Sequence, residues 1–129
     1  MTEAKTKILV VDDDARLRDL LNRYLTEQGF TVRAISDATD MNRQLARERY
    51  DLMILDLKMP GRDGYEVLEW IRSKSQRPRV AVFTASALDT DKTRSTQLGA
   101  DLFQTKSFEI DSLDRFITRL YSLCKPSPM

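Results

Sequence analysis

The sequence predicts a doubly wound α/β domain in which five parallel strands alternate with five helices. Short runs rich in Val, Ile and Leu recur along the chain, and segments with apolar residues at helical spacing separate them. The length of 129 residues suits one domain with a single core. We therefore treat residues 1–124 as one domain, and residues 125–129, which contain two prolines, as a tail or the stump of a linker.

The first strand and helix meet in an acidic turn. Residues 8–11 form a continuous apolar run, which is typical of a strand buried on both faces, and the run stops at Asp12. Leucines at helical spacing follow, and they predict a helix that Asp14 caps and Gly29 ends. Three consecutive aspartates, beginning with Asp12, therefore lie between a buried strand and a helix.

The strand and helix pattern repeats through the middle of the chain. Residues 31–35 predict a second strand, and residues 37–48 predict a second helix. Residues 52–55 are apolar and predict a third strand, which Asp56 follows directly. Two glycines and a proline in residues 59–64 then mark a loop.

The third helix and the fourth strand come next. Val67, Leu68 and Ile71 recur at helical spacing and predict the helix. Residues 80–83 predict a strand that ends at Thr84.

The last two helices enclose a short fifth strand. Residues 88–98 predict a polar helix that ends before Gly99, and residues 101–105 predict the strand, which leads to Lys106. An amphipathic helix completes the domain. Its apolar positions are Leu113, Phe116, Ile117, Leu120 and Cys124.

This alternation implies parallel strands joined by right-handed crossovers, with helices on both faces of the sheet. We expect the flavodoxin-like strand order 2-1-3-4-5. In such sheets ligands bind outside the carboxyl ends of the strands, beside the point where the strand order reverses. Functional residues should therefore lie along that edge.

Four strands deliver polar residues to the same edge. These residues are Asp12 and Asp13 after the first strand, Asp56 after the third, Thr84 at the end of the fourth and Lys106 after the fifth. Neighbouring strands lie about 4.8 Å apart, which brings Asp13 and Asp56 within reach of one cation. Crowded carboxylates raise one another's pKa unless a hard divalent ion neutralises them, and oxygen ligands suit Mg²⁺. We expect Mg²⁺ and Lys106 to balance the three negative charges.

The same residues suit phosphoryl transfer. The Asp56 carboxylate can form an aspartyl phosphate by in-line attack. Lys106 and the metal would stabilise the transferring oxygens, and the Thr84 hydroxyl can donate to one of them. Taken singly, Asp56 also fits a loop position. It is the combination that favours the functional interpretation.

Residues 8–14, residues 56–64, Thr84-Ala85 and Lys106 resemble, in type and spacing, the receiver domains of two-component response regulators. The resemblance covers nearly the whole chain, and through about Gly64 it is closest to the OmpR-type transcriptional regulators. It implies a bacterial, cytoplasmic signalling protein that takes a phosphoryl group from a sensor histidine kinase or a phosphotransfer protein. Such a protein is a regulatory phosphoacceptor that catalyses only its own phosphorylation and dephosphorylation.

The resemblance also assigns roles at the metal. Asp56 is implied as the phosphoacceptor. Mg²⁺ would be bound by the side chains of Asp13 and Asp56, by the backbone carbonyl of Lys58, and by Asp12 through a water molecule.

Further roles concern the phosphoryl group and the switch. Thr84, the backbone of Ala85 and Lys106 would contact the phosphoryl group. Phe103 would be the switch aromatic, which turns inward when the Thr84 hydroxyl is drawn to the phosphoryl group. The signal would leave by the face formed by the fourth helix, fifth strand and fifth helix. A homodimer through that face, a downstream protein target and a C-terminal output domain all remain open.

The sequence departs from the family after Lys106, where Ser107 stands in place of the usual proline. A cis peptide before serine costs about 2.5–4 kcal/mol, so we expect this bond to be trans. Residues 89–96 and 111–115 also do not match well the alternating charges through which OmpR-type regulators dimerise. These two departures leave open a degenerate receiver that binds a partner without being phosphorylated.

Composition excludes several other classes. The formal net charge of +1 gives no reason to expect direct binding to nucleic acid or to a membrane surface. The absence of histidine excludes the usual zinc sites and Ser/His pairs, and a single cysteine excludes an internal disulfide. No apolar run approaches the roughly 18 residues of a spanning helix, so we expect a soluble cytoplasmic protein.

Three other α/β functions fit less well. A dinucleotide-binding domain needs a glycine-rich turn after the first strand, and the three aspartates there would repel a pyrophosphate. A flavodoxin-type electron carrier fails for the same reason. A haloacid-dehalogenase-like phosphatase also uses a strand-end aspartate, but its motif is Asp-x-Asp, and here Lys58 occupies the second position. Turnover of small phosphate esters would distinguish that phosphatase from a receiver.

Overall fold

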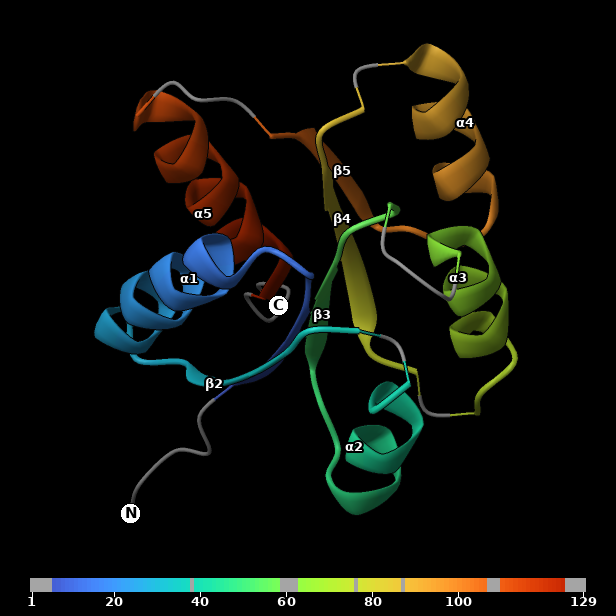
Figure 1. Ribbon diagram of the computed structural model, residues 1–129, viewed down its shortest axis with the longest axis horizontal. Coiled ribbons are helices and arrows are strands. Elements are labelled where there is room, and N and C mark those ends of the chain that lie inside the picture. Colours follow the sequence, from blue (N-terminus) through green and yellow to red (C-terminus); the bar gives the residue numbers. More distant parts are fainter. Residues whose placement is uncertain are drawn as a thin grey trace, which may run out of the picture.

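Five parallel strands form one sheet in the order β2-β1-β3-β4-β5 in the computed structural model (Figure 1). The residues that the structure describes are 6–37, 39–58, 63–75, 77–86, 88–106 and 110–124. The strands are β1 (Lys7–Val11), β2 (Thr31–Ile35), β3 (Leu52–Leu55), β4 (Arg79–Thr84) and β5 (Leu102–Thr105). The predicted fold class and strand order are confirmed.

The helices cover both faces of the sheet, as a doubly wound fold requires. They are α1 (Ala15–Glu27), α2 (Met41–Arg47), α3 (Gly64–Arg72), α4 (Asp89–Gln97) and α5 (Ile110–Cys124). Figure 1 shows α1 and α5 on one side of the sheet and α2, α3 and α4 on the other.

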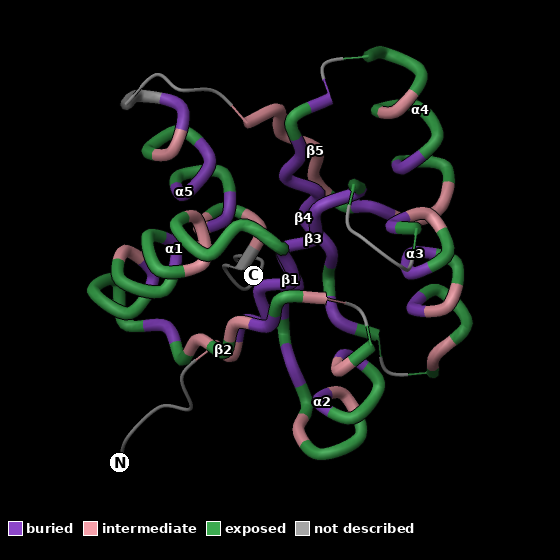
Figure 2. Tube along the Cα trace, in the orientation of Figure 1, coloured by how far each residue is buried: buried purple, intermediate pink, exposed green. Residues whose placement is uncertain are grey.

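The alternation of side chains along each strand produces two cores. In β1, Ile8 and Val10 pack toward α1 and α5, whereas Leu9 and Val11 pack toward α2 and α3. All four are fully buried, which explains the uninterrupted apolar run in the sequence. Figure 2 shows buried residues along the central strands β1, β3 and β4 and exposed residues on the outer sides of the helices.

The predicted caps of the first helix are confirmed. The Asp14 side chain accepts hydrogen bonds from the backbone amides of Arg16 and Leu17, at 3.0 and 3.3 Å. After the helix, Gly29 has a φ of +96°, a left-handed conformation that favours glycine. These two residues set the length of α1 and therefore fix where the acidic turn ends.

The second helix is shorter than predicted, so the expected range of 37–48 was wrong. The helix begins at Met41 because the Asp37 side chain accepts a hydrogen bond from the Thr39 amide at 2.9 Å, a turn that competes with helix formation. It ends before Glu48, whose backbone is extended. The other predicted elements agree with the structure to within a few residues.

Three predictions fall wholly or partly outside the described residues: those for residues 59–62 of the predicted loop, for the bond before Ser107 and for the tail 125–129. Among the residues that are described, no helix combines the length and apolarity that crossing a membrane requires.

Candidate functional site

The carboxyl ends of the strands bring the predicted site residues to one edge of the sheet. Val11 of β1 is paired with Leu55 of β3, so the next residues, Asp12 and Asp56, leave adjacent strands at the same level. The Asp56 amide donates to the Val11 carbonyl at 3.1 Å, which continues the ladder by one bond. Both aspartates are buried, with exposed fractions of 1% for Asp12 and 5% for Asp56.

Lys106 links these two carboxylates. Its Nζ atom lies 2.8 Å from Oδ2 of Asp12 and 3.0 Å from Oδ2 of Asp56. Burial alone would lower the pKa of Lys106, but the hydrogen bond and charge of Asp12, followed by those of Asp56, raise it above its ordinary value of 10.5. Lys106 is therefore the cation that neutralises part of the acidic cluster.

The burial of the Asp12 carboxylate is only partly compensated by its neighbours. Burial raises the pKa of its carboxyl above the ordinary value of 3.8, and the hydrogen bonds from Lys106 and the Asp14 amide offset only part of that effect. One lysine thus does not fully compensate for the burial of this carboxylate.

Three carboxylates lie close enough to share one cation. One oxygen from each of Asp12, Asp13 and Asp56 falls within 4.8 Å of the others, and Asp13 is exposed while the other two are buried. An all-oxygen cluster that opens to solvent on one side suits a hard divalent ion that keeps some of its water, such as Mg²⁺. The expected proximity of Asp13 and Asp56 is confirmed.

Backbone contacts hold the acidic side chains in place. Oδ1 of Asp12 accepts a hydrogen bond from the Asp14 amide at 2.9 Å, and Oδ1 of Asp56 accepts one from the Lys58 amide at 3.2 Å. The guanidinium of Arg18, in α1, donates to the backbone carbonyl of Asp12 at 2.8 Å. This contact of Arg18 could not be predicted, because nothing in the spacing of the residue indicates a bond to a backbone carbonyl.

Thr84 carries a buried hydroxyl beside this cluster. The residue is fully buried, and its Oγ1 atom has no hydrogen-bond partner among the described residues. A buried hydroxyl without a protein partner is costly, so this donor is available for a hydrogen bond to a ligand or a water molecule. The Thr84 carbonyl accepts from the Lys106 amide, which ties the ends of β4 and β5 together.

The structure places the remaining predicted residues around this edge. Ala85 follows Thr84 and is exposed. Phe103, in β5, is partly buried against the core on the α2 and α3 side, as its apolar character suggests. Phe103 also lines a groove of about 290 Å³ between α4 and β5. Ser107 is outside the described residues, so the predicted trans bond before it stays a prediction.

A polar network that no sequence pattern predicts lies beside Thr84. Ser86 and Tyr65 both donate hydrogen bonds to the carboxylate of Asp91, and the Arg94 guanidinium lies 4.0 Å from the centre of the Tyr65 ring. Burial and the bond to Asp91 raise the pKa of Tyr65 to about 12. The network joins α3 and α4 to the segment that follows Thr84.

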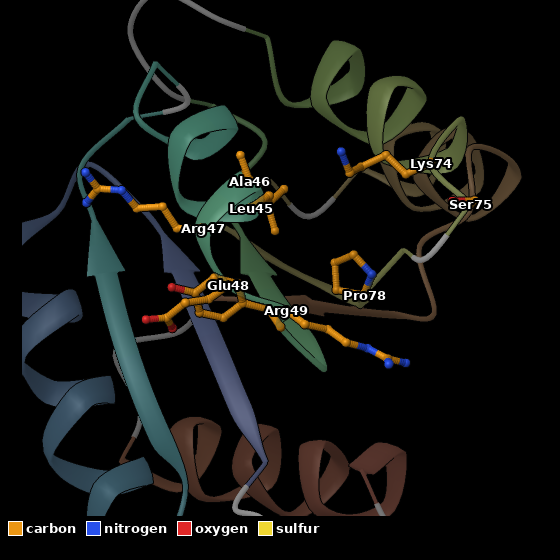
Figure 3. A pocket seen from close by; sticks show the side chains of 9 residues that line it. Leu45, Ala46, Arg47, Glu48, Arg49, Lys74, Ser75 and Pro78 are labelled. Carbon is orange, nitrogen blue, oxygen red and sulfur yellow. The ribbon is translucent and has the colours of Figure 1, made fainter.

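A larger groove, of about 530 Å³, lies at the opposite end of the sheet (Figure 3). Its walls come from the end of α2, the segment before β3 and the segment between α3 and β4. It is lined by Leu45, Ala46, Arg47, Glu48, Arg49, Tyr50, Lys74, Ser75 and Pro78. Because these segments precede β3 and β4, the groove is remote from the acidic edge.

The fold and the site define a class of protein: a doubly wound α/β domain with three carboxylates, a lysine and a buried hydroxyl at the carboxyl edge of its sheet. The profile of the response regulator receiver domain matches residues 8–118. The chain therefore belongs to the response regulator receiver domains, the regulatory domains of two-component systems.

Known relatives agree with this assignment. The transcriptional regulatory protein GltR of Pseudomonas aeruginosa is 39% identical over 103 residues, which are 78% of this chain and 43% of GltR. The transcriptional regulatory protein TctD of Salmonella typhimurium is 33% identical over 121 residues, 94% of this chain and 53% of TctD. The chain thus spans about half the length of the curated relatives it matches.

Solved structures share the fold. The response regulator TrrA of Thermotoga maritima, in a complex with Mg²⁺ and BeF, superposes with a TM-score of 0.74 at 33% identity. The match covers 89% of this chain and 98% of TrrA.

Proposed function

We propose that this receiver domain accepts a phosphoryl group onto Asp56 from a phosphohistidine of a sensor kinase or phosphotransfer protein. The observation that carries the proposal is the position of Asp56: its carboxylate is buried at the sheet edge, bonded to Lys106 and grouped with Asp12 and Asp13. An acceptor for a dianionic group needs cationic and hydrogen-bonding neighbours, and this position supplies them.

The metal in this proposal is Mg²⁺. Asp13 and Asp56 would bind it by their side chains, Lys58 by its backbone carbonyl and Asp12 through water. When bound, Mg²⁺ would neutralise charge on the carboxylates and on the incoming phosphoryl oxygens. The presence of Mg²⁺ and BeF together in TrrA supports the same use of this site.

The transfer itself exchanges one bond for another. An oxygen of the Asp56 carboxylate attacks phosphorus, the P–N bond to the donor imidazole breaks, and the imidazole keeps the electron pair and takes up a proton. Nζ of Lys106 lies 3.0 Å from Oδ2 of Asp56 and would follow the charge onto the phosphoryl group. Thr84 Oγ1 and the Ala85 amide would donate to phosphoryl oxygens, which would give the unpartnered hydroxyl its missing bond.

Output would follow from that new bond. Drawing Thr84 toward the phosphoryl group would shift the start of the β4–α4 connection, with Phe103 as the switch aromatic and the α4-β5-α5 face as the output surface. The names of GltR and TctD describe transcriptional regulation, and we infer that this domain controls an output domain, a protein target or a homodimer in the same way. The protein would act as a cytoplasmic regulator whose chemistry is confined to its own phosphorylation and dephosphorylation.

Mass spectrometry after incubation with acetyl phosphate and Mg²⁺ tests the proposal. A gain of about 80 Da, expected for one phosphoryl group, should appear in the wild type and be absent in Asp56→Asn and in an EDTA control. Asp13→Ala should need more Mg²⁺ for the same yield. No gain in a folded protein that binds Mg²⁺, with candidate kinases also tried, would favour a receiver that acts without phosphorylation.

A further inference from the structure

Asp12 and Asp13 are joined by a peptide that lies between two regular elements. β1 ends at Val11 and α1 begins at Ala15, so the Asp12 carbonyl lies beyond the strand ladder and before the first helical turn. The same peptide carries the Asp13 amide, and its orientation decides where the Asp13 side chain points. Whatever holds this carbonyl therefore influences the position of a proposed metal ligand.

Arg18 holds that carbonyl from the helix. Its Nη1 atom donates to the Asp12 oxygen at 2.8 Å, and the Arg18 amide donates to the Asp14 carbonyl at 3.0 Å within the helix. The side chain is partly buried, and Asp12 itself is 1% exposed. Arg18 is therefore held at its backbone by the helix and at its guanidinium by the Asp12 carbonyl, which makes it a rigid support for the acidic turn.

We infer that Arg18 is a positioning residue of the acidic site: by holding the Asp12 carbonyl it orients the peptide that carries Asp13, and so prepares the Mg²⁺ ligands. The inference rests on the proposed Mg²⁺ site. It concerns binding geometry, because Arg18 contacts a backbone oxygen and none of the three carboxylates in the described contacts.

The positive charge of Arg18 and its role as a support predict opposite changes in Mg²⁺ affinity when the residue is substituted. Arg18 is a cation near a cation site, so removal of its charge alone should tighten Mg²⁺ binding slightly. Loss of a support for metal ligands should weaken it, typically by 10–100-fold. The sign of the change in affinity therefore separates the two roles.

The experiment is a calorimetric Mg²⁺ titration of the wild type, Arg18→Met and the matched control Arg16→Met. Arg16 is an exposed arginine two residues earlier in the same helix, so its substitution removes an equal charge. We expect Arg18→Met to weaken binding about tenfold and Arg16→Met to change it by no more than about twofold. Equal or tighter binding by folded Arg18→Met would overturn the inference.

A second readout does not depend on the metal. In amide correlation spectra of the metal-free proteins, the Asp13 amide should shift in Arg18→Met and stay in place in Arg16→Met. If wild-type protein binds no Mg²⁺, the proposed function fails, while the Asp13 amide still reports whether Arg18 holds the peptide. If Arg18→Met does not fold, Arg18→Gln is judged by the same criteria, and loss of folding in both variants would assign Arg18 to the fold instead.

Discussion

Thr84 allows a test in which stability and response change in opposite directions. Its hydroxyl is fully buried without a partner among the described residues, so the resting protein carries the cost of an unsatisfied polar group. Valine has nearly the same shape and replaces the hydroxyl with a methyl group. Thr84→Val should therefore stabilise the unphosphorylated protein, although it removes a proposed phosphoryl contact.

The size of the gain follows from the cost of the orphaned hydroxyl. Such a group costs about 1–3 kcal/mol, and a stabilisation of about 1 kcal/mol is expected after imperfect repacking around the new methyl. For a domain of this length, that corresponds to a rise in Tm of about 4 °C.

Urea unfolding in EDTA measures this gain, and Thr105→Val is the matched control. Thr105 pairs with Thr84 across β4 and β5, but its Oγ1 donates to the Ser86 carbonyl at 3.3 Å. The same substitution there removes a bond that is made, so it should destabilise the protein by about 1 kcal/mol.

Beryllium fluoride with Mg²⁺ then tests the response. Wild-type protein should gain more stability from this phosphoryl mimic than Thr84→Val, by about 1.5–3 kcal/mol, because a hydrogen bond to a charged group is lost in the variant. A Thr84→Val protein that is less stable than wild type in EDTA would refute the reasoning, since the hydroxyl would then be satisfied in the resting state.

Three further predictions concern the same edge. Gly64→Ala should lower the free energy of unfolding by about 1–3 kcal/mol and slow phosphoryl uptake, because a Cβ there would lie 2.6 Å from the Cα atom of Leu57, the residue after Asp56. Unchanged urea unfolding and an unchanged mass gain would contradict this. Lys106→Met should lower the free energy of unfolding of the metal-free protein by about 3 kcal/mol at neutral pH, because it leaves buried Asp12 and Asp56 without a cation. Mg²⁺ should then raise the Tm of this variant more than that of the wild type. Equal increases in Tm would count against the role of Lys106. Because the folded-state pKa of Lys106 lies above 10.5, its stabilising contribution is complete below that pH and is lost as the pH rises through the higher value. Urea unfolding from about pH 10 upward should therefore show a steeper loss of stability in wild type than in Lys106→Met.

The fold could be predicted because each element is marked locally. The apolar run of β1 is buried on both faces, Asp14 caps α1, and Gly29 takes the left-handed conformation that ends it. The start of α2 could not be predicted in the same way. A side-chain bond from Asp37 to the next turn competes with the helix there, and composition alone does not decide between the two.

The site could be predicted in part for a related reason. Parallel topology places the ends of β1, β3, β4 and β5 along one edge, so Asp12, Asp56 and Lys106 were expected to lie together. Contacts that join separate segments through single polar residues carry no such signal. The bonds from Tyr65 and Ser86 to Asp91 connect three separate parts of the chain, and each residue alone is unremarkable in the sequence.

On the proposed function, the charge of the site accounts for a use of the Thr84 hydroxyl, which has no partner among the described residues. Three carboxylates and Lys106 give a net charge of −2 when all are ionised, which one divalent cation balances. On the proposed function, phosphorylation removes the charge of Asp56 and adds a group of about −2, so the balanced site becomes negative by roughly one charge. The added negative charge would attract a hydrogen-bond donor. Thr84 Oγ1 can serve because it makes no hydrogen bond among the described residues that would first have to break. Ser86 and Tyr65 are both bonded to Asp91, so on the proposed function a shift of Thr84 toward the phosphoryl group would pull on α4 and on Tyr65 in α3. A local change of charge would then displace two helices.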